Sequence, residues 1–291
     1  MSNVLAQGKE DERMQLNRIY NEDCLEGMKR IPDKSVDMIL CDLPYGTTAC
    51  KWDSIIPFEP LWEQYERIIK NNGAIVLFGS EPFSTEMRHS NLQMYKYDWV
   101  WNKVNGFGFL DCKYRPLKSH EMVSVFSNGG CSNGSKVPMK YNPQDLVHRV
   151  KKMKNKLKSE LLHSNPAKEE YTSVATNYPK SILEFKKDNE GLHPTQKPVA
   201  LLEYLIKTYT NEGETVLDNC MGSGTTAIAC INTNRNYIGF ELDKHYCDIA
   251  NERIQKAMQD KAVRERNTVR EDDRQPPQTR SEWLDDLLSG G

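Results

Sequence analysis

Val216–Ala229, which reads VLDNCMGSGTTAIA, joins a short apolar run, a turn with two glycines and a run of helix-forming residues. This order predicts a β-strand, a tight turn and the start of an α-helix. Gly222, Gly224 and Ala227 fit the G-x-G-x-x-G/A fingerprint of a nucleotide-binding turn. Glu241 ends the next predicted strand, where such folds place an acid for ribose hydroxyls. The stretch therefore predicts a β-α unit with a nucleotide-binding turn.

The residues around this turn favour one ligand over a dinucleotide. Asp218 stands just before the glycines, where a carboxylate would repel a pyrophosphate and attract a cation. No Lys-Ser/Thr pair follows the glycines, so the turn is not a P-loop. Only 69 residues follow Gly222, fewer than the remaining strands of a dinucleotide domain require. S-adenosylmethionine carries a sulfonium and an ammonium but no phosphate, and it is the predicted cofactor. A structural turn without a ligand is the alternative.

Short apolar runs alternate with amphipathic stretches on both sides of a central region of different character. Residues 18–127 and 191–258 both read as strands followed by helices, which predicts a parallel sheet covered by helices on both faces. Residues 128–190 lack this alternation and are predicted to be an insertion. Residues 259–291 are charged and contain RQPPQTR, so we expect a flexible tail there.

A second motif, Ile39–Gly46 (ILCDLPYG), places an acid, a proline and an aromatic ring after an apolar run. The exocyclic amine of a base is a poor nucleophile because its lone pair is delocalised into the ring. A carboxylate and a backbone carbonyl that accept its two N–H groups would shift the nitrogen toward tetrahedral geometry. Asp42 and Leu43 can supply these acceptors. Pro44 fixes the turn, and Tyr45 offers a face for stacking an extruded base. An ordinary Asx turn is the alternative.

Three motifs resemble those of DNA amino-methyltransferases: DLPYG (42–46), HPTQKP (193–198) and LDNCMGSGTT (217–226). Their order, with the catalytic motif first and the cofactor loop last, is similar to the β group of that family. The resemblance covers most of residues 18–258. It implies a Rossmann-like seven-strand sheet in circularly permuted order, in which the N-terminal segment supplies the strand after Glu241. It also implies that the insertion is a target-recognition region that reads the DNA sequence.

The resemblance assigns roles to individual residues. It makes Asp42, Leu43, Pro44 and Tyr45 the catalytic turn, with base flipping bringing the target to it. Asp23 would bind the cofactor's adenine amine, and Thr195 and Lys197 would line the methionine end. No metal is required, because the sulfonium is already a good leaving group. The residues implied to hold the cofactor are Asp23, Cys24, Thr195, Lys197, Asp218, Cys220, Gly222, Ser223, Gly224, Thr225 and Glu241.

Leu43 departs from the family pattern, which is Asp, Asn or Ser followed by Pro-Pro-Tyr. Its backbone carbonyl remains, so the mechanism holds with a less rigid turn. An initial aspartate resembles the members that methylate adenine N6, whereas serine is commoner in those that act on cytosine N4. We therefore expect a DNA methyltransferase acting on adenine N6. The alternatives are cytosine N4, RNA or protein amide methylation, an inactive DNA-binding relative and, more distantly, a nicotinamide oxidoreductase.

A basic cluster lies within the insertion, although the whole chain has a formal net charge of −2. Residues 136–158 hold eight lysines and arginines against one aspartate. Apolar residues at positions 147, 150, 153, 157 and 161 predict a helix with lysines on its other face. A solvated helix face is the alternative to nucleic-acid contact. Double-stranded DNA is the predicted partner, contacted through Lys136, Lys140, Arg149, Lys151 and Lys152.

The chain shows no apolar run long enough to cross a bilayer and no signal-peptide segment, so we expect a cytoplasmic protein. Eight cysteines are scattered without a C-x-x-C pair, which favours reduced thiols and no zinc site. The family resemblance adds a homodimer as a further expectation.

Overall fold

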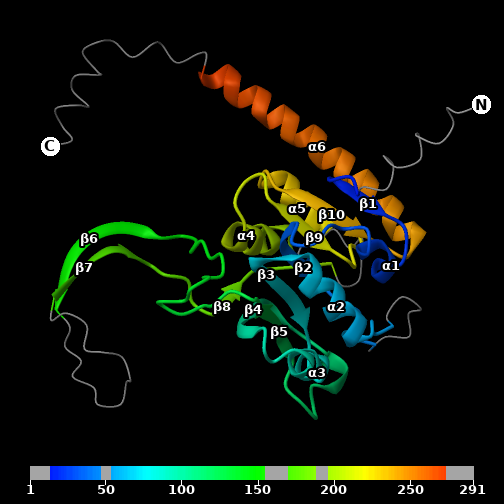
Figure 1. Ribbon diagram of the computed structural model, residues 1–291, viewed down its shortest axis with the longest axis horizontal. Coiled ribbons are helices and arrows are strands. Elements are labelled where there is room, and N and C mark those ends of the chain that lie inside the picture. The colour runs from blue at the N-terminus through cyan, green and yellow to red at the C-terminus, as the bar shows by residue number, and fades with distance from the viewer. Residues whose placement is uncertain (1–13, 47–53, 155–169, 188–195, 273–291) are drawn as a thin grey trace, which may run out of the picture.

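Within the residues that the structure describes, eight strands form one sheet (Figure 1). The computed structural model describes residues 14–46, 54–154, 170–187 and 196–272. The order across the sheet is β1-β10-β9-β2-β3-β5-β4-β8. These strands are β1 (Arg18–Tyr20), β2 (Val36–Cys41), β3 (Ile69–Gly79), β4 (Tyr95–Phe107), β5 (Lys118–Phe126), β8 (Ile182–Glu184), β9 (Thr215–Asp218) and β10 (Asn236–Phe240).

Helices cover both faces of this sheet. Apolar side chains of α1, α2 and α3 pack in one buried cluster, and those of α4, α5 and α6 pack in another on the opposite face. The layered α/β architecture predicted from the sequence is therefore confirmed. The helices of the described chain are α1 (Cys24–Met28), α2 (Phe58–Ile68), α3 (Phe83–Ser90), α4 (Val199–Tyr209), α5 (Thr225–Asn232) and α6 (Lys244–Asp272), with a 3-10 turn, η1, at Phe109–Asp111.

The central position of strand β2, covered on both faces of the sheet, explains why its sequence is almost continuously apolar. All six of its residues are buried. Met38 and Leu40 belong to the cluster with α4, α5 and α6, whereas Ile39 and Cys41 belong to the cluster with α1, α2 and α3. A strand covered on both faces needs an apolar side chain at successive positions. The apolar run that precedes Asp42 is therefore a central strand, which fixes the place where the catalytic turn begins.

The permuted strand order is confirmed. β1 pairs in parallel with β10, with Arg18 opposite Ile238, so the N-terminal segment supplies the strand outside β10. β2 pairs in parallel with β9, with Ile39 opposite Leu217. The strands that carry the catalytic turn and the glycine turn are therefore direct neighbours, although they lie almost 180 positions apart in the sequence.

The sheet is mostly parallel, as predicted, but one strand departs from this pattern. β5 runs antiparallel to both β3 and β4. No helix separates β4 from β5, so a hairpin joins them and their directions must oppose. The sheet also gains an eighth strand, β8, which comes from the insertion and pairs in parallel with β4, with Val100 opposite Ile182. The insertion is thus anchored to the edge of the sheet.

The predicted helix is also wrong over its described part, residues 147–154. The structure has β6 (Val147–Lys154) paired antiparallel with β7 (Glu170–Thr176) in a separate two-stranded sheet. The two strands form an arm that extends away from the helix-covered sheet (Figure 1). The spacing of the apolar residues suited a helix, but β-branched valines and a β-rich partner, YTSVAT, favour strand pairing instead. Residues 155–169 lie outside the described residues.

Helix α6 runs beyond the boundary predicted at residue 258 and ends at Asp272. The segment from 259 onward was predicted to be a tail because it is charged, but its first part is rich in helix-forming Ala, Glu, Arg and Lys. The rest of the predicted tail, 273–291, lies outside the described residues. Among the helices that the structure describes, none has the length and apolar character needed to span a membrane.

Candidate active site

The catalytic turn and the glycine turn line one cavity of about 420 Å³. Because β2 and β9 are parallel neighbours, the turns that follow them leave the sheet at the same edge. Segments distant in the sequence thus meet in one place. The predicted site residues that line this cavity are Asp23, Cys24, Asp42, Leu43, Pro44, Tyr45, Lys197, Asp218, Cys220, Gly222, Ser223, Thr225 and Glu241.

Asp42 is held by two neighbours in the catalytic turn. The Tyr45 hydroxyl donates a 2.6 Å hydrogen bond to Oδ1, and Lys197 forms a short ion pair with Oδ2. Each carboxylate oxygen still has a lone pair for another donor. Burial and the Asp42 carboxylate raise the pKa of Tyr45 well above its usual value, so the phenol stays protonated and keeps donating. Leu43 is buried beside them, which anchors the turn.

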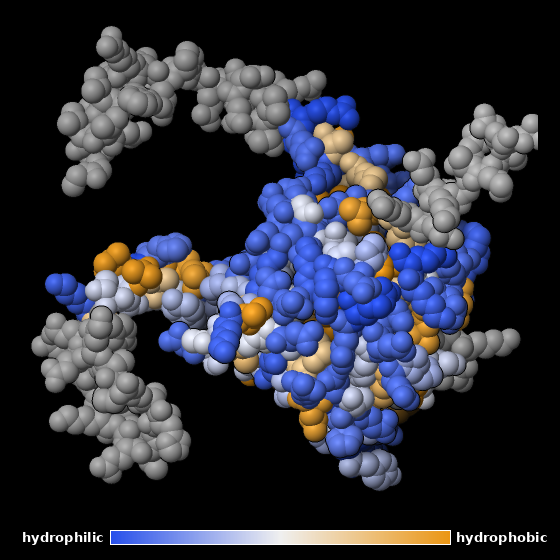
Figure 2. Space-filling model, viewed as in Figure 1, coloured by the Kyte–Doolittle hydropathy of each residue, from blue (hydrophilic) through white to orange (hydrophobic). Residues whose placement is uncertain are grey.

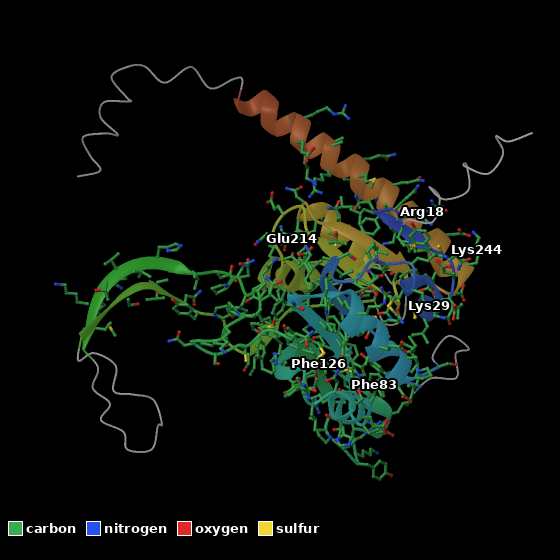
Figure 3. All side chains as sticks on the ribbon, in the orientation of Figure 1. Arg18, Lys29, Phe83, Phe126, Glu214 and Lys244 are labelled. Carbon is green, nitrogen blue, oxygen red and sulfur yellow. The ribbon has the colours of Figure 1, made fainter. Side chains whose placement is uncertain are left out.

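The Tyr45 ring packs against Phe83 of α3, with ring centroids 4.9 Å apart and planes inclined by 32°. Figure 3 labels Phe83 on the half of the molecule that contains α3 and β5. Phe83 is itself buried, so it gives the tyrosine a fixed backing. The hydroxyl bond to Asp42 and this ring contact fix the ring's position at the cavity wall, before any base arrives.

A buried network of alternating charges lies behind Asp42. Lys197 is buried between Asp42 and Glu121, whose Oε2 lies 3.3 Å from Nζ, and Lys103 forms a short ion pair with the same glutamate. Burial opposes the charge of Lys197, but the two carboxylates outweigh it and raise its pKa. Burial likewise opposes ionisation of Glu121, yet the two lysines lower its pKa to about 2. Lys197 and Glu121 therefore both stay ionised at neutral pH.

Lys197, which was expected to line the methionine end of the cofactor, lies in the wall of the cavity. Its ammonium is committed to the two carboxylates. Thr195, predicted to act beside it, lies outside the described residues. The sequence analysis missed Glu121 and Gln196, both of which line the cavity. The Gln196 side-chain amide is buried without a hydrogen-bond partner among the described residues.

The glycine turn has the backbone that its sequence predicted. Gly222 and Gly224 have φ angles of +52° and +84°, a region that favours glycine. A Cβ on Gly222 would meet nothing within 4 Å, whereas a Cβ on Gly224 would lie 2.9 Å from Ala250 Cβ of α6. Gly222 therefore opens toward the cavity. Gly224 does not line it and instead allows the turn to pack against α6.

Two acids frame the glycine turn. Asp218 accepts hydrogen bonds from the Cys220 backbone N–H at 3.0 Å and from the Thr226 hydroxyl at 2.5 Å. Glu241 accepts a 2.7 Å bond from the Gly222 N–H through Oε2 and a bond from the Asp243 N–H through Oε1. Burial raises the pKa of Asp218 to about 6 and raises that of Glu241 as well. Both acids thus present acceptors whose charge a cationic or hydroxyl-bearing ligand would stabilise.

Asp23 and Cys24 complete the far end of the cavity. Oδ1 of Asp23 caps α1 by accepting from the N–H groups of Leu25 and Glu26, at 2.8 and 3.3 Å. The other carboxylate oxygen has no partner among the described residues and can accept an amine N–H. Nδ2 of Asn219 lies 3.6 Å from the sulfurs of both Cys24 and Cys220, which brings these thiols together.

The predicted DNA-contacting residues separate into two groups. Arg149, Lys151 and Lys152 are exposed on β6 in the arm. Figure 2 shows polar and apolar side chains together on this arm, where Val150 is 78% exposed. Lys136 is exposed in the loop that leads toward it. Lys140 forms ion pairs with Glu214 and Asp37, so it ties the insertion to the sheet and is not available to a phosphate.

The comparisons with known proteins agree with this geometry. A family model described as "DNA methylase", of the N6/N4 type, matches residues 36–252. The chain belongs to the N6/N4 DNA methylase family. The expected cofactor, S-adenosylmethionine, is thereby confirmed as the methyl donor of the family, and DNA is its substrate. The match spans the catalytic turn, the insertion and the glycine turn, so the resemblance inferred from three short motifs is confirmed.

Individual relatives support the same family. The type II methyltransferase M.HinfI of Haemophilus influenzae is 30% identical over 82% of this chain and 68% of its own length. M.HpaI of Haemophilus parainfluenzae is 28% identical over 81% of this chain and 74% of its length. The crystal structure of the M1.HpyAVI–SAM complex is 26% identical, with a TM-score of 0.54, and the match covers 81% of this chain and 98% of that one. PvuII DNA methyltransferase (cytosine-N4-specific), at 14% identity and a TM-score of 0.58, shares the fold.

The raised pKa of Asp218 predicts a pH-dependent cofactor affinity. Below about pH 6 the buried carboxyl is protonated and loses the charge that attracts the cofactor's ammonium, whereas above pH 6 the charge is present. We expect the dissociation constant for S-adenosylmethionine, measured by calorimetry, to increase as the pH falls from 7.5 to 5. Asp218→Asn should bind weakly at pH 7.5 and lose most of this dependence. An unchanged pH profile in the variant would contradict the assignment.

Proposed function

We propose that this chain methylates the N6 amine of adenine in duplex DNA, with S-adenosylmethionine as the donor and a base flipped out of the helix as the acceptor. The observation that carries the proposal is the shared cavity, in which Asp42 and Tyr45 from one end of the chain lie beside the glycine turn from the other. The family model sets the reaction class, and the finer assignment rests on the residues of the site.

When bound, S-adenosylmethionine supplies a methyl group on a positively charged sulfur. The residues present suit this group, because Asp218 and Glu241 provide buried acceptors and Gly222 leaves open space beside them. Asp218 would hold the ammonium and Glu241 the ribose hydroxyls. Oδ2 of Asp23 would accept a hydrogen bond from the adenine amine of the cofactor. Ser223 and Thr225 would contribute hydroxyls from the glycine turn.

Asp42 acts on the amine of the target base. One N–H of that amine donates to the Asp42 carboxylate and the other to the Leu43 carbonyl, which localises the lone pair on nitrogen. The amine then forms the new N–C bond as the S–C bond breaks, and sulfur retains the electron pair. The amine proton passes to the Asp42 carboxylate. Tyr45 holds that carboxylate at Oδ1 and stacks on the base, so the acceptor is already oriented.

The choice of adenine rests on the aspartate at position 42, since serine is commoner at this place in enzymes that resemble the cytosine-N4 group. Cytosine N4 is the second candidate, favoured by the shared fold of the PvuII enzyme. Methylation of RNA or a protein amide, and an inactive DNA-binding role, remain alternatives for the test below.

Duplex DNA would be engaged through the arm. Arg149, Lys151 and Lys152 are exposed on β6 and can neutralise phosphates, which dominate the affinity of proteins for DNA. A two-stranded arm of this kind also fits the width of the major groove. The homodimer and the cytoplasmic location expected from the sequence are retained as parts of this proposal; sedimentation of the purified chain tests the first.

The direct test is to express the chain in cells that lack DNA methylation and to sequence their DNA with detection of modified bases. We expect N6-methyladenine at a single short sequence, absent from cells that carry the Asp42→Asn chain. Detection of N4-methylcytosine in place of N6-methyladenine would favour the second candidate, methylation of cytosine N4. Unmodified DNA, despite folded chain in the cells, would contradict DNA methylation.

The role of Asp42 predicts that binding and chemistry can be separated. Asp42→Asn keeps the shape of the side chain but removes the charge that polarises the amine, so kcat should fall by about a hundredfold or more. The affinity for S-adenosylmethionine should stay close to that of the original chain. The matched control Asp33→Asn removes an exposed carboxylate outside the cavity and should leave kcat unchanged. A large loss of cofactor affinity in Asp42→Asn would show that its role is different.

The arm predicts a specific change in salt dependence. Lys151→Glu combined with Lys152→Glu should weaken DNA binding and reduce the slope of log affinity against log salt by about 2, one unit per lost phosphate contact. The matched control reverses Lys29 and Lys244, which are exposed on the side of the molecule away from the arm (Figure 3). Fluorescence anisotropy with labelled duplex measures both. Equal effects from the two double variants would mean that only net charge matters.

A further inference from the structure

The hairpin between β4 and β5 carries an exposed apolar tip. Phe109 is 69% exposed, Leu110 is 99% exposed and Tyr114 is 89% exposed. Exposure of three large apolar or aromatic side chains within six residues is costly in water. The established reaction gives them no role, because none of them lines the cavity. They therefore indicate a surface that meets another molecule.

This tip stands at the edge of the sheet where the cavity opens. β5 is antiparallel to β3, with Met122 opposite Gly79, so Lys118 at the start of β5 lies beyond the end of β3. Lys118 also contacts Ser80, which follows β3. The chemistry takes place at this same edge, since β3 pairs with β2 and β2 leads into Asp42. The hairpin therefore projects from the rim of the candidate active site.

The two strands under the tip form part of the cavity wall. Trp101 of β4 and Glu121 of β5 are paired across the hairpin, and both line the cavity. From that pair the strands continue outward to Phe107 and Lys118, which pair again just below the tip. In Figure 1 the hairpin forms the end of the sheet body farthest from α6. A molecule bound at the cavity mouth would thus meet the tip directly.

Backbone hydrogen bonds and contacts at its base hold the tip in a defined shape. The backbone N–H of Asp111 donates to the Gly108 carbonyl at 3.1 Å, and that of Tyr114 donates to the Asp111 carbonyl at 2.9 Å. Phe107 is held at the base by Lys103 and Lys187, whose ammonium nitrogens lie 5.4 and 5.0 Å from the ring centre. These contacts present Phe109 and Leu110 on a turn of defined shape, so little ordering is required when they bind.

The charge around the tip suits a polyanion. Lys113, Arg115 and Lys118 are exposed on the hairpin, against one carboxylate, Asp111. Lysine and arginine beside apolar side chains are the combination found where proteins contact DNA phosphates and enter the base stack. A protein partner or a membrane would need a larger apolar area than two or three side chains supply. The occupant that fits is a DNA duplex.

We propose that Phe109 and Leu110 form a wedge that enters the DNA base stack at the step from which the target base is extruded. This inference rests on the proposed function, because it requires a base that leaves the duplex. Extrusion leaves an apolar gap, and a side chain that fills the gap offsets the lost stacking. Lys113 would then contact a flanking phosphate. The wedge would fill the gap that the base leaves, while Tyr45 would stack on the extruded base.

The test compares one double variant on two duplexes. Phe109→Ala with Leu110→Ala should methylate a fully paired duplex, containing the site found by sequencing, at least about tenfold more slowly than the original chain. On the same duplex with an abasic position opposite the target, extrusion breaks no base pair, and the variant should recover to within about threefold of the original chain. Affinity for S-adenosylmethionine should be unchanged on both.

The matched control is Leu92→Ala. Leu92 is 60% exposed and precedes β4, at the opposite edge of the sheet from the hairpin, so its rates should equal those of the original chain on both duplexes. An unchanged rate for the double variant, or an equal loss on both duplexes, would overturn the wedge while leaving the methyltransferase intact. An original chain that methylates neither duplex would overturn the proposed function and the wedge with it.

Discussion

The buried ion pair between Lys197 and Asp42 is the contact on which the site depends. It joins residues 155 positions apart, because Lys197 follows the insertion and Asp42 follows β2. A buried lysine is tolerated only when its charge is paired, and here Asp42 and Glu121 both pair it. Removing either partner would leave a charge in an apolar wall beside Phe78. The segment that leads into α4 is therefore locked to the catalytic turn.

This arrangement has a consequence for catalysis. Both oxygens of Asp42 already have a partner before substrate arrives, one in Lys197 and one in Tyr45. The carboxylate is thus held in place, so in the proposed reaction a substrate amine would meet an acceptor that needs no reorientation. Glu121 helps to position Lys197. Lys103 forms a second ion pair with Glu121 and so balances the charge of this second carboxylate.

Local signals allowed the central strands and turns to be predicted from the sequence, whereas the permuted order was implied by the resemblance of three motifs to a known family. An apolar run before Asp42 marks a buried strand, and glycines after Asp218 mark a turn. The charge network was missed because Glu121 sits in an ordinary strand, HEMVSVF, and only the pairing of β4 with β5 turns it inward. The ion pairs of Lys140 were missed for a similar reason, since Asp37 of β2 and Glu214, just before β9, are distant from it in the sequence.

The arm shows the limit of periodicity. The spacing of Val147, Val150 and Met153 fits a helix. Only pairing with the partner strand at 170–176 makes this segment a β-strand. The end of α6 was predicted too early for a related reason, because a charged surface helix and a flexible tail share a composition. In both cases the deciding contact is non-local, so no window of the sequence contains it.

The central claim is that the Asp42 turn and the glycine turn form one chamber in which the donor and the base meet. A crystal structure with sinefungin, whose amine replaces the transferable methyl group, tests this claim most directly. We expect its amino-acid end beside Asp218, its ribose hydroxyls at Glu241 and its amine facing the Asp42–Tyr45 turn. An analogue bound outside this cavity, or with its amine turned away from Asp42, would contradict the account.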